Sequence, residues 1–176
     1  MKQLLVVSVL AEDRPGILRD FARAVKDCGC NVVESRMTVL GGEFTMLLLV
    51  SGNWNTITKL EGQLPKLEKL LGLSLSVRRT AERDPRHDLV PYAIDAVCVD
   101  QPGIILNLAD FFAEHNIGIA DLFTRGYPAA HTGAPMFSVQ MAVNIPADLH
   151  IGSLREEFMD FCDRLNLDAI MEPIKN

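Results

Sequence analysis

The strongest constraint on the fold is a five-residue motif that occurs twice. The first copy is Asp13-Arg14-Pro15-Gly16-Ile17 and the second is Asp100-Gln101-Pro102-Gly103-Ile104, with their first residues 87 positions apart. This spacing is about half of the 176-residue chain. A repeat of such length is close to a minimal domain and too long for one unit of a solenoid. The sequence therefore predicts two copies of one module.

Each motif follows an apolar, strand-like run and opens a segment of helical periodicity. Pro15 suits the first turn of a helix, since its missing N–H has no partner there. The first half is predicted to contain strand 4–10, a helix from 15 to 28, strands 31–39 and 44–50, helix 53–63 with a short continuation over 65–71 after a break, and strand 73–79. The second half is predicted to contain strand 92–99, a helix from 104 to 115, strands 118–124 and 136–143, helix 151–165 and strand 168–173.

The order β-α-β-β-α-β in each half predicts the fold class. We expect an α+β protein made of two ferredoxin-like modules in tandem, each an antiparallel sheet with helices on one face. The modules should span 1–80 and 91–176. A linker over 81–90 is expected between them, because the stretch from Thr80 to Pro91 is charged, contains two prolines and lacks periodicity.

The strand predicted at 44–50 has apolar residues on both faces. Its Phe, Met and Val side chains alternate with Leu47 and Leu49. A four-stranded sheet with helices on one side leaves its other side in water. These leucines therefore predict cover from the sister module or from a second chain, and in the latter case a homo-oligomer.

Charge and composition argue against several classes of function. The net charge of −6 is opposite to what a nucleic-acid surface needs, so direct DNA or RNA binding is not expected. No apolar run approaches the roughly 20 residues that cross a bilayer. Residues 1–4 lead straight into a strand-like run without a cleavage site. We expect a cytoplasmic protein without membrane contact.

The residues that could carry out catalysis or bind metal form no recognisable pattern. Four cysteines, Cys28, Cys30, Cys98 and Cys162, lack zinc or C-x-x-C spacing. The four histidines are scattered, and the sequence contains no nucleophile elbow or glycine-rich phosphate loop. The sequence therefore predicts no enzyme activity, no metal and no cofactor.

The repeated motif itself has the chemistry of a small zwitterion site. It places a helix N-terminus, with unpaired amides and a positive dipole end, directly after a strand. Gly16 and Gly103 remove side chains that would obstruct a ligand, while Asp13 and Asp100 place carboxylates beside the amides. The amides suit a ligand carboxylate and the aspartates suit its ammonium group.

A purely structural reading of the motif is equally open. Proline and glycine can simply shape the turn while the aspartate caps the helix. Asn31, at the start of the next predicted strand, could lie beside the turn and offer a donor and an acceptor, or it could only end the helix-to-strand loop. The predicted site residues are Asp13, Arg14, Pro15, Gly16, Ile17, Asn31, Asp100, Gly103 and Ile104.

The second predicted hairpin differs from the first in its connection. Residues 125–135 join its strands, where the first hairpin needs only Gly41 and Gly42. Long loops inside compact domains often carry function. Arg125 and Tyr127 could contact a partner, and an unconstrained surface loop is the alternative.

Paired modules that each open with an Asp-x-Pro-Gly-Ile turn resemble tandem ACT domains. The first module further resembles the bacterial glycine cleavage system transcriptional repressors. The motifs that carry this resemblance are Asp13 to Ile17, Cys28-Gly29-Cys30-Asn31, Glu34-Ser35-Arg36, Leu40-Gly41-Gly42-Glu43-Phe44-Thr45 and Ser51-Gly52-Asn53-Trp54-Asn55. The resemblance implies a regulator without a DNA-binding domain that contacts a DNA-bound activator, with glycine relieving repression.

Two hypotheses for function follow. The first is an amino-acid-responsive transcriptional regulator that binds a small amino acid, glycine by resemblance, and acts through a protein partner. The second is a ligand-free protein-interaction module made of two ACT domains, in which both turns are structural.

Overall fold

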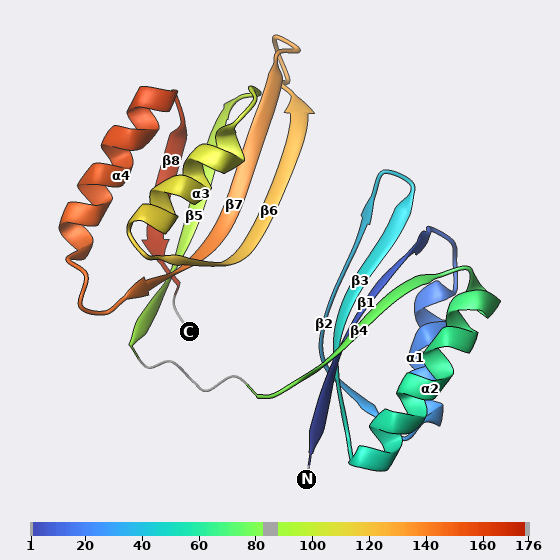
Figure 1. Ribbon diagram of the computed structural model, residues 1–176. Coiled ribbons are helices and arrows are strands. Elements are labelled where there is room, and N and C mark those ends of the chain that lie inside the picture. The colour runs from blue at the N-terminus through green and yellow to red at the C-terminus, as the bar shows by residue number, and fades with distance from the viewer. Residues whose placement is uncertain (1, 83–87, 175–176) are drawn as a thin grey trace. The chain divides into compact units, whose positions relative to one another are not determined.

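The computed structural model describes residues 2–82 and 88–174. The chain divides into two compact units, Met1–Asp84 and Pro85–Asn176. Each contains one four-stranded antiparallel sheet, in the orders β2-β3-β1-β4 and β6-β7-β5-β8. In each unit two helices cover one face of the sheet (Figure 1). This arrangement, read twice along the chain, confirms the predicted tandem ferredoxin-like fold.

The first unit contains β1 (Gln3–Glu12), α1 (Ile17–Asp27), β2 (Asn31–Leu40), β3 (Glu43–Gly52), α2 (Trp54–Leu71) and β4 (Ser74–Thr80). The second contains β5 (Leu89–Val99), α3 (Ile104–Glu114), β6 (Gly118–Pro128), β7 (Pro135–Pro146), α4 (Ile151–Leu165) and β8 (Asp168–Pro173). In the second unit, β5 to β8 take the places that β1 to β4 occupy in the first.

The internal repeat extends to a local irregularity in the sheets. In the first unit the pairing of β2 with β3 shifts register between Val32 and Glu34. In the second unit the pairing of β6 with β7 shifts between Ile119 and Asp121, 87 positions later. A β-bulge re-aims the side chains that follow it. The same bulge at the same place therefore gives Glu34 and Asp121 equivalent positions.

Hydrophobic periodicity explains how each helix packs on its sheet. In α1 the side chains of Ile17, Phe21 and Val25 recur every four residues and are all buried. In β1 the alternating residues Val7 and Val9 face the same core. The apolar side of the helix thus packs against the apolar face of the strand.

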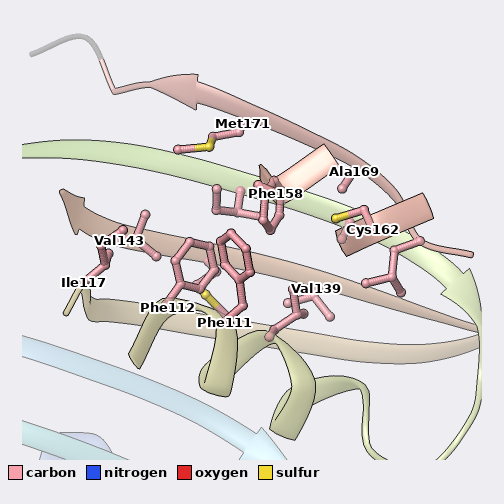
Figure 2. Close-up of a cluster of buried hydrophobic side chains, with 14 of the residues drawn as sticks. Phe111, Phe112, Ile117, Val139, Val143, Phe158, Cys162, Ala169 and Met171 are labelled. Atoms are coloured by element: carbon pink, nitrogen blue, oxygen red, sulfur yellow. The ribbon is translucent and has the colours of Figure 1, made fainter. Parts of the chain in front are cut away.

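The core of the second unit is rich in phenylalanine. Phe112 of α3 and Phe158 of α4 are fully buried, with ring centroids 5.6 Å apart. Phe111 lies edge-on to Phe112 at 5.3 Å. Figure 2 shows these rings among aliphatic side chains of the sheet, including Val139 and Val143. Aromatic contacts of this kind add to the free energy gained by burial alone.

The predicted break in the helix before β4 is wrong. The structure contains one continuous helix, α2, with Pro65 inside it. A proline there removes one backbone hydrogen bond. Burial of Ile57, Leu60 and Leu64 on the sheet holds the helix together on both sides of the proline. The Asn53 side chain also caps its start by accepting from the Thr56 amide at 2.9 Å.

The long loop predicted at 125–135 is shorter in the structure, because five of its eleven residues belong to the strands. β6 continues to Pro128 and β7 begins at Pro135, so residues 129–134 alone form the connection. The two prolines form the last pair of the ladder. At a strand end, a missing N–H removes no interior hydrogen bond. Arg125 therefore lies on a strand opposite Ser138 rather than in a loop.

The predicted linker is also shorter than expected at its C-terminal end. Residues 83–87 lie outside the described part of the chain, and β5 already begins at Leu89. The Asp88 carbonyl accepts a hydrogen bond from the Ala147 amide at 2.8 Å. This bond ties the end of the linker to the residue that follows β7, before the predicted boundary at 91.

The sheet face opposite the helices is not covered within either unit. The side chain of Leu47 on β3 is 53% exposed, while Leu49 is half-buried. The module on its own therefore leaves this face open, and the expected cover from the sister module or from a second chain stays a prediction. What could cover this face is considered below.

Replacing Phe158 by Ala should destabilise the protein by about 3–5 kcal/mol, because it opens a cavity among packed rings. Urea denaturation followed by circular dichroism would measure the loss in the free energy of unfolding. Met159→Ala is the matched control, since Met159 is the next residue of α4 and is 39% exposed; it should change stability by about 0.5 kcal/mol or less. Equal effects of the two changes would contradict the assigned core.

Candidate functional site

The repeated motif forms the same backbone turn in both units. The amide of Asp13 donates to the Gly42 carbonyl at 3.0 Å, and the amide of Asp100 donates to the Pro135 carbonyl at 2.9 Å. In each unit the turn after the central strand is thus tied to the adjoining hairpin. This tie fixes where the following helix begins.

A glycine in the left-handed conformation precedes the first helix of each unit. Gly16 has φ 92° and Gly103 has φ 94°, and each is the N-cap residue. L-residues with side chains are strained in this region. Their carbonyls accept the first helical hydrogen bonds, from Asp20 at 3.0 Å and from Asn107 at 2.9 Å. Pro15 therefore lies just before the cap, and not within the first helical turn as predicted.

The aspartates of the motif do not cap the helices. Neither α1 nor α3 has a side-chain cap hydrogen bond, within the residues that the structure describes. Asp13 and Asp100 are both exposed. In α1 the Ile17 amide donates to the Arg14 carbonyl at 3.5 Å. The other first-turn amides have no side-chain cap and can reach a ligand or water. The capping role considered for these aspartates is not what the structure shows.

Arginine side chains surround the start of α1. Arg19 donates from Nε and Nη2 to Oδ1 of Asp20 at 3.0 and 2.9 Å. Arg14 Nη1 lies 3.8 Å from Oδ2 of the same carboxylate. A Cβ on Gly16 would come within 3.2 Å of Arg19 Nη2. The glycine therefore lets a guanidinium approach the helix N-terminus closely.

The equivalent place in the second unit has no arginine. Gln101 and Leu106 stand where Arg14 and Arg19 stand in the first unit, counted from the two motifs. The Gln101 side chain donates instead to the carbonyl of Leu165 at 3.4 Å. The two turns thus share a backbone and differ in charge.

The isoleucines of the motif belong to the core. Ile17 and Ile104 are 3% and 4% exposed and lie in the two hydrophobic clusters. Their side chains anchor the helices and do not reach the surface of the turn. Their contribution to a site is therefore through the backbone.

Asn31 does not lie beside the turn. It pairs with Ser51 near the C-terminal end of β3, while Glu12 pairs with Glu43 at the other end. Eight residues of antiparallel strand separate these positions, about 27 Å along the sheet. The expectation that Asn31 joins Asp13 in one site of the same module is therefore wrong.

A cleft of about 400 Å³ lies between α3 and α4. His115 lines this cleft, and its Nδ1 lies 2.8 Å from the Phe111 carbonyl while its Nε2 lies 3.0 Å from a carboxylate oxygen of Glu157. The hydrogen bond to the Phe111 carbonyl, followed by the one to Glu157, raises the pKa of His115 above its ordinary value. Asp110, Glu114, Asp160 and Arg164 complete the charged lining.

No pattern in the sequence predicted this cleft. The sequence does place Phe111 and His115 on one face of a predicted helix, because they are four residues apart. Glu157 comes from another helix, and only the folded structure brings it to the ring.

Cys28, Cys98 and Cys162 are buried, and Cys30 is half-buried. All four are free. Burial raises the pKa of Cys28 and Cys98, and it raises that of Cys162 to about 12. A thiol that stays protonated is a poor nucleophile and metal ligand. Within the described residues, no group of three or more potential ligands could hold a metal ion, and no helix is long and apolar enough to cross a membrane.

Known proteins resemble the chain over nearly its full length. The sequence model of the ACT domain family matches residues 3–78. The glycine cleavage system transcriptional repressors of Escherichia coli (strain K12) and Shigella flexneri are each 35% identical over 163 residues, or 92% of this chain and 85% of each relative. The chain belongs to the glycine cleavage system transcriptional repressor family.

Solved structures extend the likeness to the second ACT module. A crystal structure assigned to a glycine cleavage system transcriptional repressor is 30% identical, with a TM-score of 0.75, and the match covers 100% of this chain and 99% of that one. An unknown protein from Galdieria sulphuraria is 29% identical, with a TM-score of 0.80, over 99% and 100% of the two chains. Both modules of this chain thus have a counterpart in each of these two structures.

The link between His115 and Glu157 predicts a pH dependence of stability. The pKa of His115 is raised above its unfolded value near 6.5, so its stabilising effect is complete below that pH and is lost as the pH rises through the folded pKa. Thermal melts of the wild type and Glu157→Gln, from about pH 5.5 to about pH 8.5, should show the gap in melting temperature shrinking with pH. Glu156→Gln, a neighbouring exposed change, is the control. A gap that stays constant with pH would contradict the assignment.

Proposed function

We propose that the protein is an amino-acid-responsive transcriptional regulator of the glycine cleavage system repressor type, which binds glycine and acts through a protein partner. The observation that carries the proposal is the uncapped start of α1, next to Asp13 and two arginines, in a member of this repressor family. The site comprises the turn from Asp13 to Ile17 in the first module. The equivalent turn at Asp100, Gly103 and Ile104 is a second, weaker site.

The chemistry of the first turn suits both ends of glycine. The amides at the start of α1 and the helix dipole attract the ligand carboxylate. Arg14 and Arg19 add positive charge on the same side, although both also lie near Asp20. The carboxylate of Asp13 is exposed and suits an ammonium group. A ligand without a side chain matches a turn whose own central residue is glycine.

The difference in charge between the turns supports unequal affinity. The second turn offers Gln101 and Leu106 in place of the two arginines. Its amides alone would attract a carboxylate less strongly. We therefore propose one occupied site per chain at low glycine concentration.

The proposed action is regulation without catalysis or direct DNA contact. A chain with a net charge of −6 is a poor match for phosphate backbones. A DNA-bound transcriptional activator is therefore the proposed partner. Glycine would change the affinity for this partner by a coupling free energy of about 1–3 kcal/mol, the usual range for effectors. Free thiols suit the reducing cytoplasm, where we place the protein.

A ligand-free interaction module is the second candidate. The observation that favours it is the exposure of Leu47 and Phe123 on the open sheet faces, at 53% and 57%. In that case both turns are structural and glycine has no effect on either stability or partner binding.

Isothermal titration of the full chain with glycine separates the two candidates. We expect saturable binding that weakens at least about tenfold in Asp13→Ala, since one charge-assisted contact contributes about 1.5–3 kcal/mol. Alanine and serine titrations test selectivity for the smallest amino acid.

Asp100→Ala is the matched control, because it makes the same change in the equivalent turn of the second module. It should leave the stronger glycine binding nearly unchanged. No heat with millimolar glycine, or binding that Asp13→Ala does not alter, would favour the interaction module.

A further inference from the structure

The open sheet faces of the two modules have hollows at equivalent positions. In the first module the hollow has a volume of about 160 Å³, and in the second about 310 Å³. The bulges and strand pairings align six residues of one lining with six of the other. The matched pairs are Val6 with Ala93, Glu34 with Asp121, Arg36 with Phe123, Leu47 with Gln140, Leu48 with Met141 and Leu49 with Ala142.

The hollow of the first module has an apolar floor. Val6 of β1 pairs with Leu49 of β3, and Leu47 lies one step further along the same face. Its volume is close to that of a cavity known to accept one benzene ring, about 150 Å³. This hollow therefore has the size and polarity for a single aromatic side chain.

The open face of the second module presents such a side chain. Phe123 on β6 is 57% exposed and lies opposite Gln140 of β7. The Gln140 side chain is held by a hydrogen bond from its Nε2 to Oδ1 of Asp95 at 3.1 Å. Phe123 thus occupies the position that Arg36 has in the first module, and its exposed ring lies near the carboxylate of Asp95.

The two faces also differ in charge. The strand pairings place Arg36, Arg78 and three carboxylates on the open face of the first module, where Glu34 lines the hollow while Glu12 and Glu43 pair with each other at the far end of their strands. They place four carboxylates and one arginine on that of the second. The second set is Asp95, Asp121, Asp168, Glu172 and Arg125. Around the hollows, Arg36 and Arg78 of the first face would meet Asp95 and Asp121 of the second, whereas two copies of the more acidic second face would repel each other.

We propose that two copies of this chain form a reciprocal dimer in which the open face of the first module of each chain covers the open face of the second module of the other. Phe123 of one chain enters the hollow lined by Val6, Leu47 and Leu49 of its partner. This proposal does not depend on glycine binding.

The area available fits a stable dimer only when the contact is made twice. Four strands about 4.8 Å apart and seven residues of about 3.4 Å each give a face of about 450 Å². Reciprocal pairing uses four such faces and buries about 1,800 Å², within the range of specific interfaces, whereas one pair buries half as much.

Sedimentation of the full-length protein over a wide range of concentration tests the proposal with two variants, Leu47→Glu and Phe123→Glu. Each change spoils both contacts of the reciprocal dimer, so each should weaken association at least about tenfold. Leu70→Glu is the control, since Leu70 is 79% exposed on α2 of the helix layer and should leave the dimer intact. Circular dichroism and melting verify folding, and Leu47→Ser with Phe123→Ser are milder substitutes if a variant unfolds.

Mixing the two glutamate variants identifies which faces pair. A chain with Leu47→Glu keeps its second face, and a chain with Phe123→Glu keeps its first, so a mixed pair retains one intact contact. Mixed dimers should therefore be weaker than the wild-type dimer, yet native mass spectrometry should detect them at concentrations where neither variant dimerises alone. Pairing of like faces would leave one of the single variants dimeric and would overturn the proposal. A wild type that stays monomeric at all concentrations would overturn it as well, because the open faces would then be covered by something else or left in water.

Discussion

The geometry of each module depends on one backbone position, the left-handed glycine between the central strand and the first helix. Gly16 and Gly103 have φ values of 92° and 94°. This conformation turns the chain so that Ile17 or Ile104 enters the core directly after the glycine. The same turn leaves the helix amides facing outward beside an aspartate. Folding and the candidate site therefore rest on the same residue, and a side chain there would strain both.

The two modules share this backbone, while the side chains around it differ. The hydrogen bond from the motif aspartate to the hairpin and the bulge of the edge strand recur in both modules. The arginines at the first turn have no counterpart in the second. The second module has instead a phenylalanine-rich core and a charged cleft around His115. Main-chain geometry sets the fold, and it leaves surface charge free to diverge.

The fold could be predicted from the sequence, because hydrophobic periodicity indicates helices and strands locally and the repeated motif indicates two equivalent modules. The sequence was insufficient wherever tertiary packing or chain direction decided the outcome. Pro65 predicts a break, yet burial of the residues around it holds α2 together. Asn31 follows the first helix closely in sequence, yet that helix carries the chain to the far end of the sheet from Asp13. His115 meets Glu157 only because α3 and α4 lie side by side. The chemistry of the turn could be predicted because its residues, from Asp13 to Ile17, follow one another in the chain.

The effector turn and the open sheet face are parts of one strand in each module. β1 contributes Val6 to the hollow and Leu10 to the exposed face, and it leads through Glu12 into the turn at Asp13. Under both proposals, a ligand that orders the turn would act on a strand that also lines the dimer contact. An effector shifts an equilibrium only through different affinities for two states. Because β1 belongs both to the glycine turn and to the open sheet face, it provides a physical route by which glycine could change the affinity of the dimer contact. The backbone of β1 pairs with β3 on one edge and with β4 on the other, so its side chains move together with the sheet.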